Sequence, residues 1–274
     1  MNEQDQDAIR KVVRDQYGQV AESEGCGCGC SDSCCGGPAP DPVALAQAMG
    51  YAPDDLEAVP DGANMGLGCG NPQAIATLKL GEIVLDLGSG GGFDAFLAAR
   101  QVGAEGHVIG VDMTPEMLSK ARANAVKGAY SNVEFRLGEI EHLPVADASV
   151  DVILSNCVIN LSPNKPQVFA EAFRVLKPGG RLAISDIVAR AELPATLRES
   201  LALYAGCVAG AAVIVEIEVM LEQAGFQQVT ITPKEASSEL IAGWFPGTSV
   251  EDYVVSATIE ARKPVCCCSG SCGP

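Results

Sequence analysis

The sequence predicts an α/β protein whose parallel sheet carries helices on both faces. Short apolar runs that are typical of strands alternate with longer helical patterns through the middle of the chain. A glycine-rich turn follows the first of these runs and comes just before a helix. The chain has 274 residues, 47% of them hydrophobic, so it is long enough to bury a core without disulfide bonds.

The elements of this sheet can be placed in chain order. Strands are expected at Ile83–Leu87, His107–Val111, Val133–Leu137, Val150–Ser155 and Arg181–Ile187. The intervening helices are expected at Phe93–Arg100, from Thr114 onward, and at Lys165–Leu176. Thr114 is a suitable N-cap and Pro115 suits the first helical position. The turn Lys177–Gly180 is expected to end the third helix.

Further segments flank this sheet at both ends. Gln6–Tyr17 predicts a short amphipathic helix with four residues on its apolar side, Ile9, Val12, Val13 and Tyr17. After the sheet, helical runs are expected at Leu193–Tyr204 and Val213–Ala224, and a late strand at Tyr253–Ala261. We therefore expect N-terminal and C-terminal additions beside the central sheet.

The charge balance bears on the possible partners. With 18 Lys+Arg against 35 Asp+Glu, the net charge is −17, which argues against binding to nucleic acid or to anionic membrane surfaces. No apolar run approaches the roughly 18 residues of a membrane span, and the N-terminus is too polar for a secretion signal. We expect a cytoplasmic protein with neither a nucleic-acid nor a membrane partner.

The glycine-rich turn is the most informative local string. Asp86 ends an apolar strand and begins the pattern D-x-G-x-G-x-G, whereas a dinucleotide site would show G-x-G-x-x-G. Asp112 ends the next strand, where a carboxylate can accept hydrogen bonds from both ribose hydroxyls of an adenosine. Glu139 follows the third strand in an acidic step that suits an adenine ring and its amino group.

Together these strings resemble class I S-adenosylmethionine-dependent methyltransferases, as does the turn Leu176–Gly180. The resemblance implies a Rossmann-like, seven-stranded sheet with helices on both faces, and S-adenosylmethionine as methyl donor. It assigns Asp86, Gly88, Ser89 and Gly90 to the methionine part, Asp112 and Met113 to the ribose and adenine, Glu139 and Ile140 to the adenine, and Asn156 to the pocket wall.

The chain also has 12 cysteines against only 2 histidines. Nine of them cluster in two short segments near the ends, while Cys69, Cys157 and Cys207 stand singly within the expected folded body. Three thiols without histidine suit a soft, thiophilic centre. Trivalent arsenic forms a pyramidal tris-thiolate with a lone pair on its fourth side, which can attack a sulfonium methyl group without removal of a proton.

The strings around these three cysteines resemble those of arsenite S-adenosylmethionine methyltransferases. The strings are G-L-G-C-G-N-P at Cys69, S-N-C-V-I-N-L at Cys157, and G-V-D-M-T at Asp112, with an interval of 207 − 157 = 50 residues to Cys207. The resemblance implies that Cys69, Cys157 and Cys207 bind arsenic(III). It implies mono-, di- and sometimes trimethylated products, as in arsenic detoxification, and a thiol reductant such as glutathione or thioredoxin.

The resemblance also bears on the remaining cysteines and on assembly. It implies a disulfide between an N-terminal cysteine and Cys69, and either Cys34 or Cys35 could be that redox partner. We expect a monomer that takes arsenite or its thiol conjugates and has no fixed metal cofactor. The resemblance assigns no role to the other clustered cysteines, which could relay metalloid, act as redox partners or scavenge soft metal.

These expectations divide the chain into four parts. Residues 1–40 are expected to hold a helix and a cysteine-rich segment, 41–190 the S-adenosylmethionine-binding domain with the Cys69 loop, 191–263 an arsenic-binding region, and 264–274 a cysteine-rich tail. Two alternatives stay open. One is a methyltransferase of a small organic acceptor, and the other is a cysteine-rich metalloid-binding protein without turnover.

Overall fold

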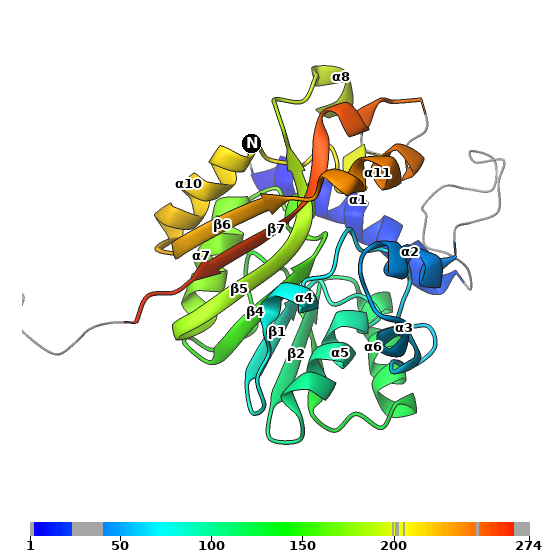
Figure 1. The fold of residues 1–274 in the computed structure, drawn as a ribbon, viewed down its shortest axis with the longest axis vertical. Helices are drawn as coiled ribbons and strands as arrows, with labels where there is room; N and C mark the ends of the chain where they lie inside the picture. Colours follow the sequence, from blue (N-terminus) through cyan, green and yellow to red (C-terminus); the bar gives the residue numbers. More distant parts are fainter. Residues whose placement is uncertain are drawn as a thin grey trace, which may run out of the picture.

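The computed structural model describes residues 3–23, 41–198, 200, 203–204, 206–244 and 247–265. Its centre is a seven-stranded sheet with the order β3-β2-β1-β4-β5-β7-β6 (Figure 1). The strands are β1 (Ile83–Leu87), β2 (His107–Asp112), β3 (Val133–Leu137), β4 (Val150–Asn156), β5 (Leu176–Ala189), β6 (Gln227–Pro233) and β7 (Val254–Arg262). The α/β class is confirmed.

The sheet is mixed, not wholly parallel as expected. Strands β1 to β5 run parallel, whereas β7 pairs antiparallel with both β5 and β6. The connection between β6 and β7 remains at one end of the sheet in Figure 1, so the chain returns in the opposite direction without crossing a face. Strands β6 and β7 both fall within residues 191–263, and this region therefore completes the central sheet.

Helices cover both faces of the sheet, as expected. They are α1 (Glu3–Glu22), α2 (Pro42–Ala48), α3 (Pro53–Glu57), α4 (Gln73–Ala76), α5 (Phe93–Val102), α6 (Pro115–Lys127), α7 (Lys165–Val175), α8 (Ala195–Arg198), α10 (Ile214–Ala224) and α11 (Ser238–Trp244). One buried cluster joins the sheet to α5 and α6, and another joins it to α7 and α10. Strand β1 contributes Val84 to the first and Leu85 to the second, which explains its uninterrupted apolar run.

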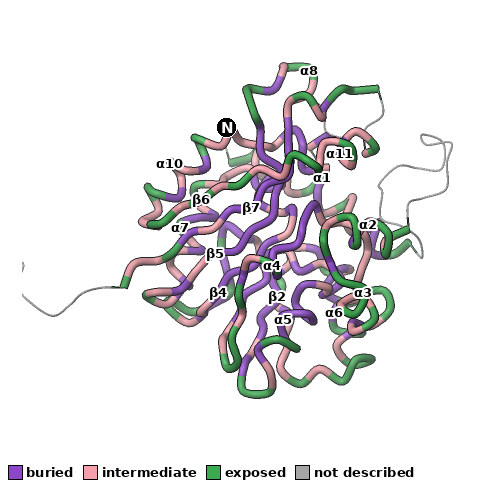
Figure 2. Tube along the Cα trace, in the orientation of Figure 1, coloured by how far each residue is buried: buried purple, intermediate pink, exposed green. Residues whose placement is uncertain are grey.

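Burial is greatest along the middle strands, as Figure 2 shows. Strand β6 differs, because its residues alternate between exposed and half-buried along an edge of the sheet. Only Val229 and Ile231 mark its apolar face, and no strand was predicted there. The helix predicted at Leu193–Tyr204 is described in part, with α8 limited to Ala195–Arg198. Helix α1 extends beyond the predicted Gln6–Tyr17 at both ends.

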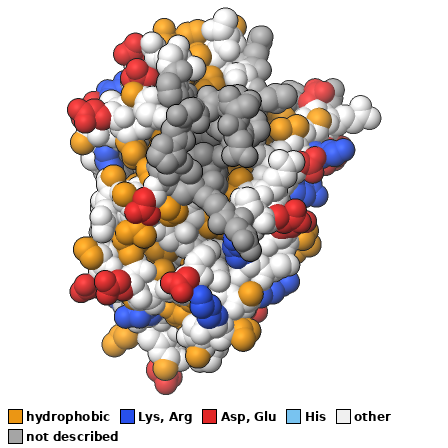
Figure 3. Space-filling view, turned by 90° about the vertical axis from the view of Figure 1, so that its right-hand side faces the viewer, with side chains coloured by type: hydrophobic (Ala, Val, Ile, Leu, Met, Phe, Trp, Pro, Cys, Tyr) orange, Lys and Arg blue, Asp and Glu red, His pale blue; other side chains and the backbone are white. Residues whose placement is uncertain are grey.

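Charged side chains of both signs are interspersed with apolar ones on the face seen in Figure 3. The acidic side chains of a chain with a net charge of −17 are thus spread over that face and do not gather in one patch. Among the described helices, none is both long enough and apolar enough to cross a membrane.

Candidate active site

The glycine-rich turn lies at the carboxyl end of β1. Gly88 and Gly90 both have positive φ values, of 64° and 49°, and Gly92 caps α5 with a φ of 94°. A Cβ atom on Gly88 would lie 2.4 Å from the side chain of Val158. This turn therefore needs glycine both for its backbone conformation and for its close contact with the loop after β4.

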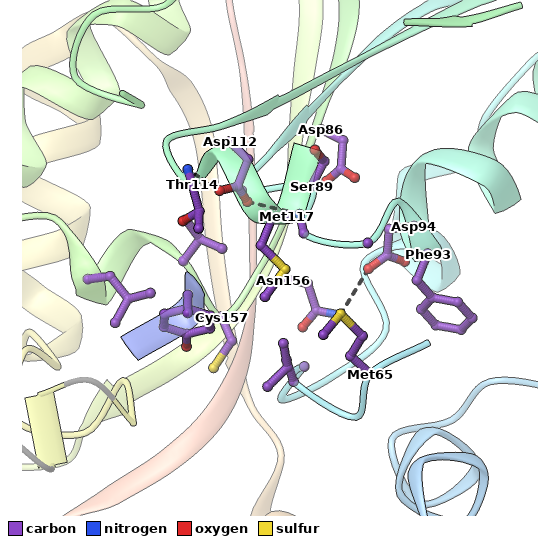
Figure 4. Close-up of a pocket in the computed structure, with 18 of the residues that line it drawn as sticks. Met65, Asp86, Ser89, Phe93, Asp94, Asp112, Thr114, Met117, Asn156 and Cys157 are labelled. Atoms are coloured by element: carbon purple, nitrogen blue, oxygen red, sulfur yellow. Dashed lines mark hydrogen bonds between the residues drawn. The ribbon is translucent and has the colours of Figure 1, made fainter. Parts of the chain in front are cut away.

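Asp112 fastens this turn to the end of β2. Its carboxylate accepts hydrogen bonds from the backbone N–H of Gly90 at 2.9 Å and of Thr114 at 2.8 Å (Figure 4). Burial raises the pKa of Asp112, and the hydrogen bonds from the Thr114 and Gly90 backbone oppose that rise. The carboxylate thus faces the cavity from a fixed position.

Asp86 and Asp94 form an acidic pair on the other side of the turn. Burial raises the pKa of Asp86 well above its usual value, and the neighbouring charge of Asp94 raises it further. One carboxylate oxygen of Asp86 and the hydroxyl of Ser89 are buried, line the cavity, and have no hydrogen-bond partner among the described residues. A donor or a cationic group in the cavity would satisfy them.

These features fit the chemistry of S-adenosylmethionine. Its α-ammonium group would meet the acidic pair, and its ribose hydroxyls would find an acceptor in Asp112. The cavity is also lined by apolar side chains, among them Met113, Met117 and Ile140, which suit a purine ring. S-adenosylmethionine, when bound, supplies an electrophilic methyl group on a sulfonium centre.

The structure gathers most of the predicted cofactor residues around this one cavity. They are Asp86, Gly88, Ser89, Gly90, Asp112, Met113, Ile140 and Asn156. Glu139 is not among the lining residues, and its carboxylate lies 3.5 Å from Arg10 of α1. Glu141, two residues further on, is buried and lines the cavity instead.

Helix α1 supplies lining residues that were not predicted. Arg10, Val13 and Tyr17 all face the cavity. Arg10 pairs with Glu141 at 3.3 Å, and Glu141 also accepts a hydrogen bond from Ser162 at 2.7 Å. The apolar side predicted for the N-terminal helix was the one signal that could have placed Val13 and Tyr17 there.

Of the three single cysteines, Cys157 lines this cavity. Cys69, Cys157 and Cys207 are buried in one cluster of side chains. Sulfur atoms of Cys69 and Cys157 and a carboxylate oxygen of Asp186 all lie within 4.8 Å of one another. The Cys207 thiol donates to the carbonyl oxygen of Cys157 at 2.7 Å. Cys34, Cys35 and the tail cysteines lie outside the described residues.

Burial governs the ionisation of these thiols. It raises the pKa of Cys69 to about 11. The pKa of Cys157 rises well above its usual value for the same reason, and that of Cys207 rises through its hydrogen bond with Cys157 and through burial. The thiols of the free protein therefore carry their protons at neutral pH. Burial also raises the pKa of Asp186, to about 6.

Asn156 connects the cofactor end of the cavity with the thiols. Its side-chain oxygen accepts from the Cys69 backbone N–H at 3.1 Å, and its amide donates to Asp94 at 3.1 Å. Figure 4 shows this side chain between Asp94 and Cys157. Tyr51 completes the network, because its hydroxyl donates to Asp94 at 2.7 Å and accepts from Asn156 at 3.0 Å.

Comparisons with known proteins agree with this geometry. A family model described as a methyltransferase domain matches residues 78–235. An arsenite methyltransferase of Halobacterium salinarum is 52% identical over 269 residues, which cover 96% of this chain and 68% of that protein. The chain belongs to the arsenite methyltransferase family.

Two solved methyltransferase structures resemble this fold. An arsenic(III) S-adenosylmethionine methyltransferase from Chlamydomonas reinhardtii is 33% identical, with a TM-score of 0.59 over 82% of this chain and 74% of that one. A Haemonchus contortus phosphoethanolamine N-methyltransferase in complex with S-adenosylmethionine has a TM-score of 0.60, over 82% of this chain and 60% of that one. At 20% identity the second likeness concerns the fold alone.

Proposed function

We propose that this chain transfers methyl groups from S-adenosylmethionine to arsenic(III) held by Cys69, Cys157 and Cys207. The supporting observation is that Cys157 belongs to both parts of the site. It lines the cavity that carries Asp86 and Asp112, and it lies in the buried cluster with the other two thiols. Substrate and methyl donor would therefore meet at Cys157.

The protonation of the thiols suits arsenite as the incoming species. Arsenous acid carries three hydroxyl groups, and each is exchanged for a thiol. Each As–O bond breaks as an As–S bond forms, and the thiol proton leaves with the hydroxyl as water. Three protonated thiols thus yield a neutral tris-thiolate and three waters, with no proton left over. Loading needs no base and no net change of charge in a buried site.

The bound arsenic would then act as the nucleophile. It keeps a lone pair on the side away from its three sulfur ligands, so the described residues need only hold it in line and exclude water. Burial of all three cysteines provides that exclusion. This explains why the site holds no histidine among its lining residues in the described part of the chain.

Repeated turnover would require a reductant. Arsenic gives up its lone pair when the As–C bond forms and becomes pentavalent, so a two-electron donor must return it to the trivalent state. A dithiol protein such as thioredoxin, or glutathione, supplies those electrons by forming a disulfide. Mono- and dimethylated arsenicals are the expected products, and a trimethylated product would follow from a third round.

Arsenic speciation tests the proposal directly. Reduced protein is incubated with arsenite, S-adenosylmethionine and glutathione, and the products are separated by chromatography with arsenic-specific detection. We expect methylated arsenicals that are absent when S-adenosylmethionine is omitted. Inorganic arsenic alone, from protein that still binds S-adenosylmethionine, would refute the proposal.

A further inference from the structure

Two of the three clustered cysteines have an unusual backbone conformation. Cys157 has a φ of 60° and Cys207 a φ of 64°, both in the left-handed region. This region is unfavourable for a side chain that carries a Cβ atom, and residues stay there only where their surroundings hold them. The positions of these two sulfur atoms therefore depend on strained turns. Without the contacts that hold them, these turns would change conformation.

Asn160 lies where it can hold both turns. Its buried amide group donates to the Asp186 carboxylate at 3.0 Å, the Ile187 carbonyl at 2.6 Å and the Cys207 carbonyl at 3.1 Å. Asn160 itself follows Cys157 by three residues. One side chain thus joins the loop after β4, strand β5 and the turn that carries Cys207.

Asp186 orients this amide. One of its carboxylate oxygens accepts from the Ile187 backbone N–H at 2.8 Å in addition to Asn160, and the other accepts from the Ile159 N–H at 2.9 Å. The same carboxylate lies within 4.8 Å of the sulfurs of Cys69 and Cys157. Asp186 therefore fixes both the loop that follows Cys157 and the amide that reaches Cys207.

Gly210 shows how closely the segment after Cys207 approaches Asn160. A Cβ atom built on Gly210 would lie 2.1 Å from the Asn160 carbonyl oxygen. Any side chain at this position must push the turn away from Asn160. Glycine is thus needed here for space, and its substitution offers a second, independent way to separate the turn from Asn160.

We propose that Asn160, oriented by Asp186, is a positioning residue that holds Cys157 and Cys207 so that both sulfurs reach one arsenic atom. The inference rests on the proposed function, since it assumes that these thiols bind arsenic(III). Asn160 does not touch the arsenic itself. It keeps the two strained turns in place before substrate arrives, so that binding need not order them.

The test compares Asn160→Ala with a matched control, Asn132→Ala. Asn132 also bridges two backbone carbonyls, those of Ala99 and Gly103, each at 3.0 Å, but it does not line the cavity. Arsenite affinity and S-adenosylmethionine affinity are measured by titration of reduced protein. Arsenic K-edge absorption spectra report the number of sulfur ligands.

For Asn160→Ala we expect arsenite affinity to fall about ten-fold and the arsenic coordination to change from three sulfurs toward two sulfurs and one oxygen. S-adenosylmethionine affinity should stay within about two-fold of the parent, and Asn132→Ala should leave all three quantities unchanged. Parent-like arsenite affinity with three sulfur ligands in Asn160→Ala would overturn the inference. So would an equal loss in Asn132→Ala.

If Asn160→Ala loses S-adenosylmethionine binding as well, this variant has lost its fold. In that case Gly210→Ala tests the inference instead. It should reproduce the weakened arsenite binding, and parent-like binding would overturn the inference. The parent protein separates the two proposals. If it neither binds arsenic through three sulfurs nor methylates it, the proposed function fails, whereas a functional parent with unaffected variants refutes only the role of Asn160.

Discussion

The two ends of the cavity are built in different ways. The cofactor end comes from neighbouring strands, and its acids and glycines follow β1, β2 and β3 within one stretch of sequence. The sulfur end brings together Cys69, Cys157 and Cys207 from three distant loops. At the first end the positive φ values of the turn belong to glycines, and at the second they belong to cysteines.

The two ends therefore differ in the steric cost of their backbone conformations. Glycine adopts the left-handed region at little cost, so the cofactor end needs few contacts to keep its shape. A cysteine pays a steric penalty there and depends on buried hydrogen bonds from its surroundings. We therefore expect the cofactor end to weaken by degrees when residues are changed, and the sulfur end to fail abruptly.

The largest expected effect is that of Cys157→Ser. A hydroxyl cannot replace a thiolate ligand of arsenic, so methylation of arsenite should fall below about one hundredth of the parent rate. S-adenosylmethionine affinity should change less than about three-fold, because the acids and glycines of the cofactor end are untouched. Product formation by arsenic speciation and cofactor binding by calorimetry provide the two measurements.

The tail cysteines supply a control for this substitution. Cys267→Ser, at a position outside the described residues, should retain at least about half of the parent activity. Equal losses from both variants would show that the sulfur end is not confined to the three buried thiols. Loss of cofactor affinity in Cys157→Ser would show that the two ends are not separable.

The ionisation of Cys69 should appear in its alkylation by iodoacetamide. Only the thiolate reacts, and with a pKa of about 11 its fraction grows about ten-fold per pH unit from pH 7 to 10. The alkylation rate should therefore rise about a hundred-fold between pH 7.5 and 9.5, followed by mass spectrometry of the Cys69 peptide. An unperturbed thiol, with a pKa near 8.5, levels off within that range.

The tail peptides of the same sample provide the comparison. Arsenite should slow the alkylation of Cys69. The tail peptides should stay accessible to alkylation if their cysteines bind arsenite more weakly than Cys69 does. A Cys69 rate that reaches its plateau below about pH 9 would contradict the expected burial of this thiol.

At the cofactor end, Asp112→Asn should raise the KM for S-adenosylmethionine about ten-fold. The new amide would place its N–H groups against the Gly90 or Thr114 N–H, which leaves a donor unpaired and loosens the glycine turn. Initial rates at varied cofactor concentration give the KM. Arsenite affinity in the absence of cofactor should match the parent, and a matching loss there would break the separation of the two ends.

Asn156→Ala tests the connection between the ends. Because Asn156 contacts both Cys69 and Asp94, both KM values should rise, each by about five-fold. The double variant of Asn156→Ala with Asp112→Asn would show a non-additive effect on the KM for S-adenosylmethionine. An effect on one substrate alone would assign Asn156 to that end.

The cofactor end could largely be predicted from the sequence, since motifs at strand ends are contiguous and sheet topology brings them together. The convergence of three thiols was expected from resemblance, but their left-handed turns, Asn160 and Asp186 were not. Those features depend on contacts between segments far apart in sequence, which no local pattern encodes. Strand β6 was missed because only two apolar residues, Val229 and Ile231, mark its alternation and its other face is exposed.

The smallest expected effect separates two glutamates after β3. The sequence pattern predicts that Glu139 contacts the adenine, whereas the structure places Glu139 beside Arg10 and Glu141 in the cavity wall. Glu141→Gln removes the buried one of the two negative charges beside Arg10 and should raise the KM for S-adenosylmethionine about three-fold. Glu139 is half-buried and lies outside the cavity lining. Glu139→Gln should therefore change this KM less than about two-fold. The reverse order would mean that Glu139 reaches the adenine when cofactor binds, and that α1 and its Arg10 shift to allow it.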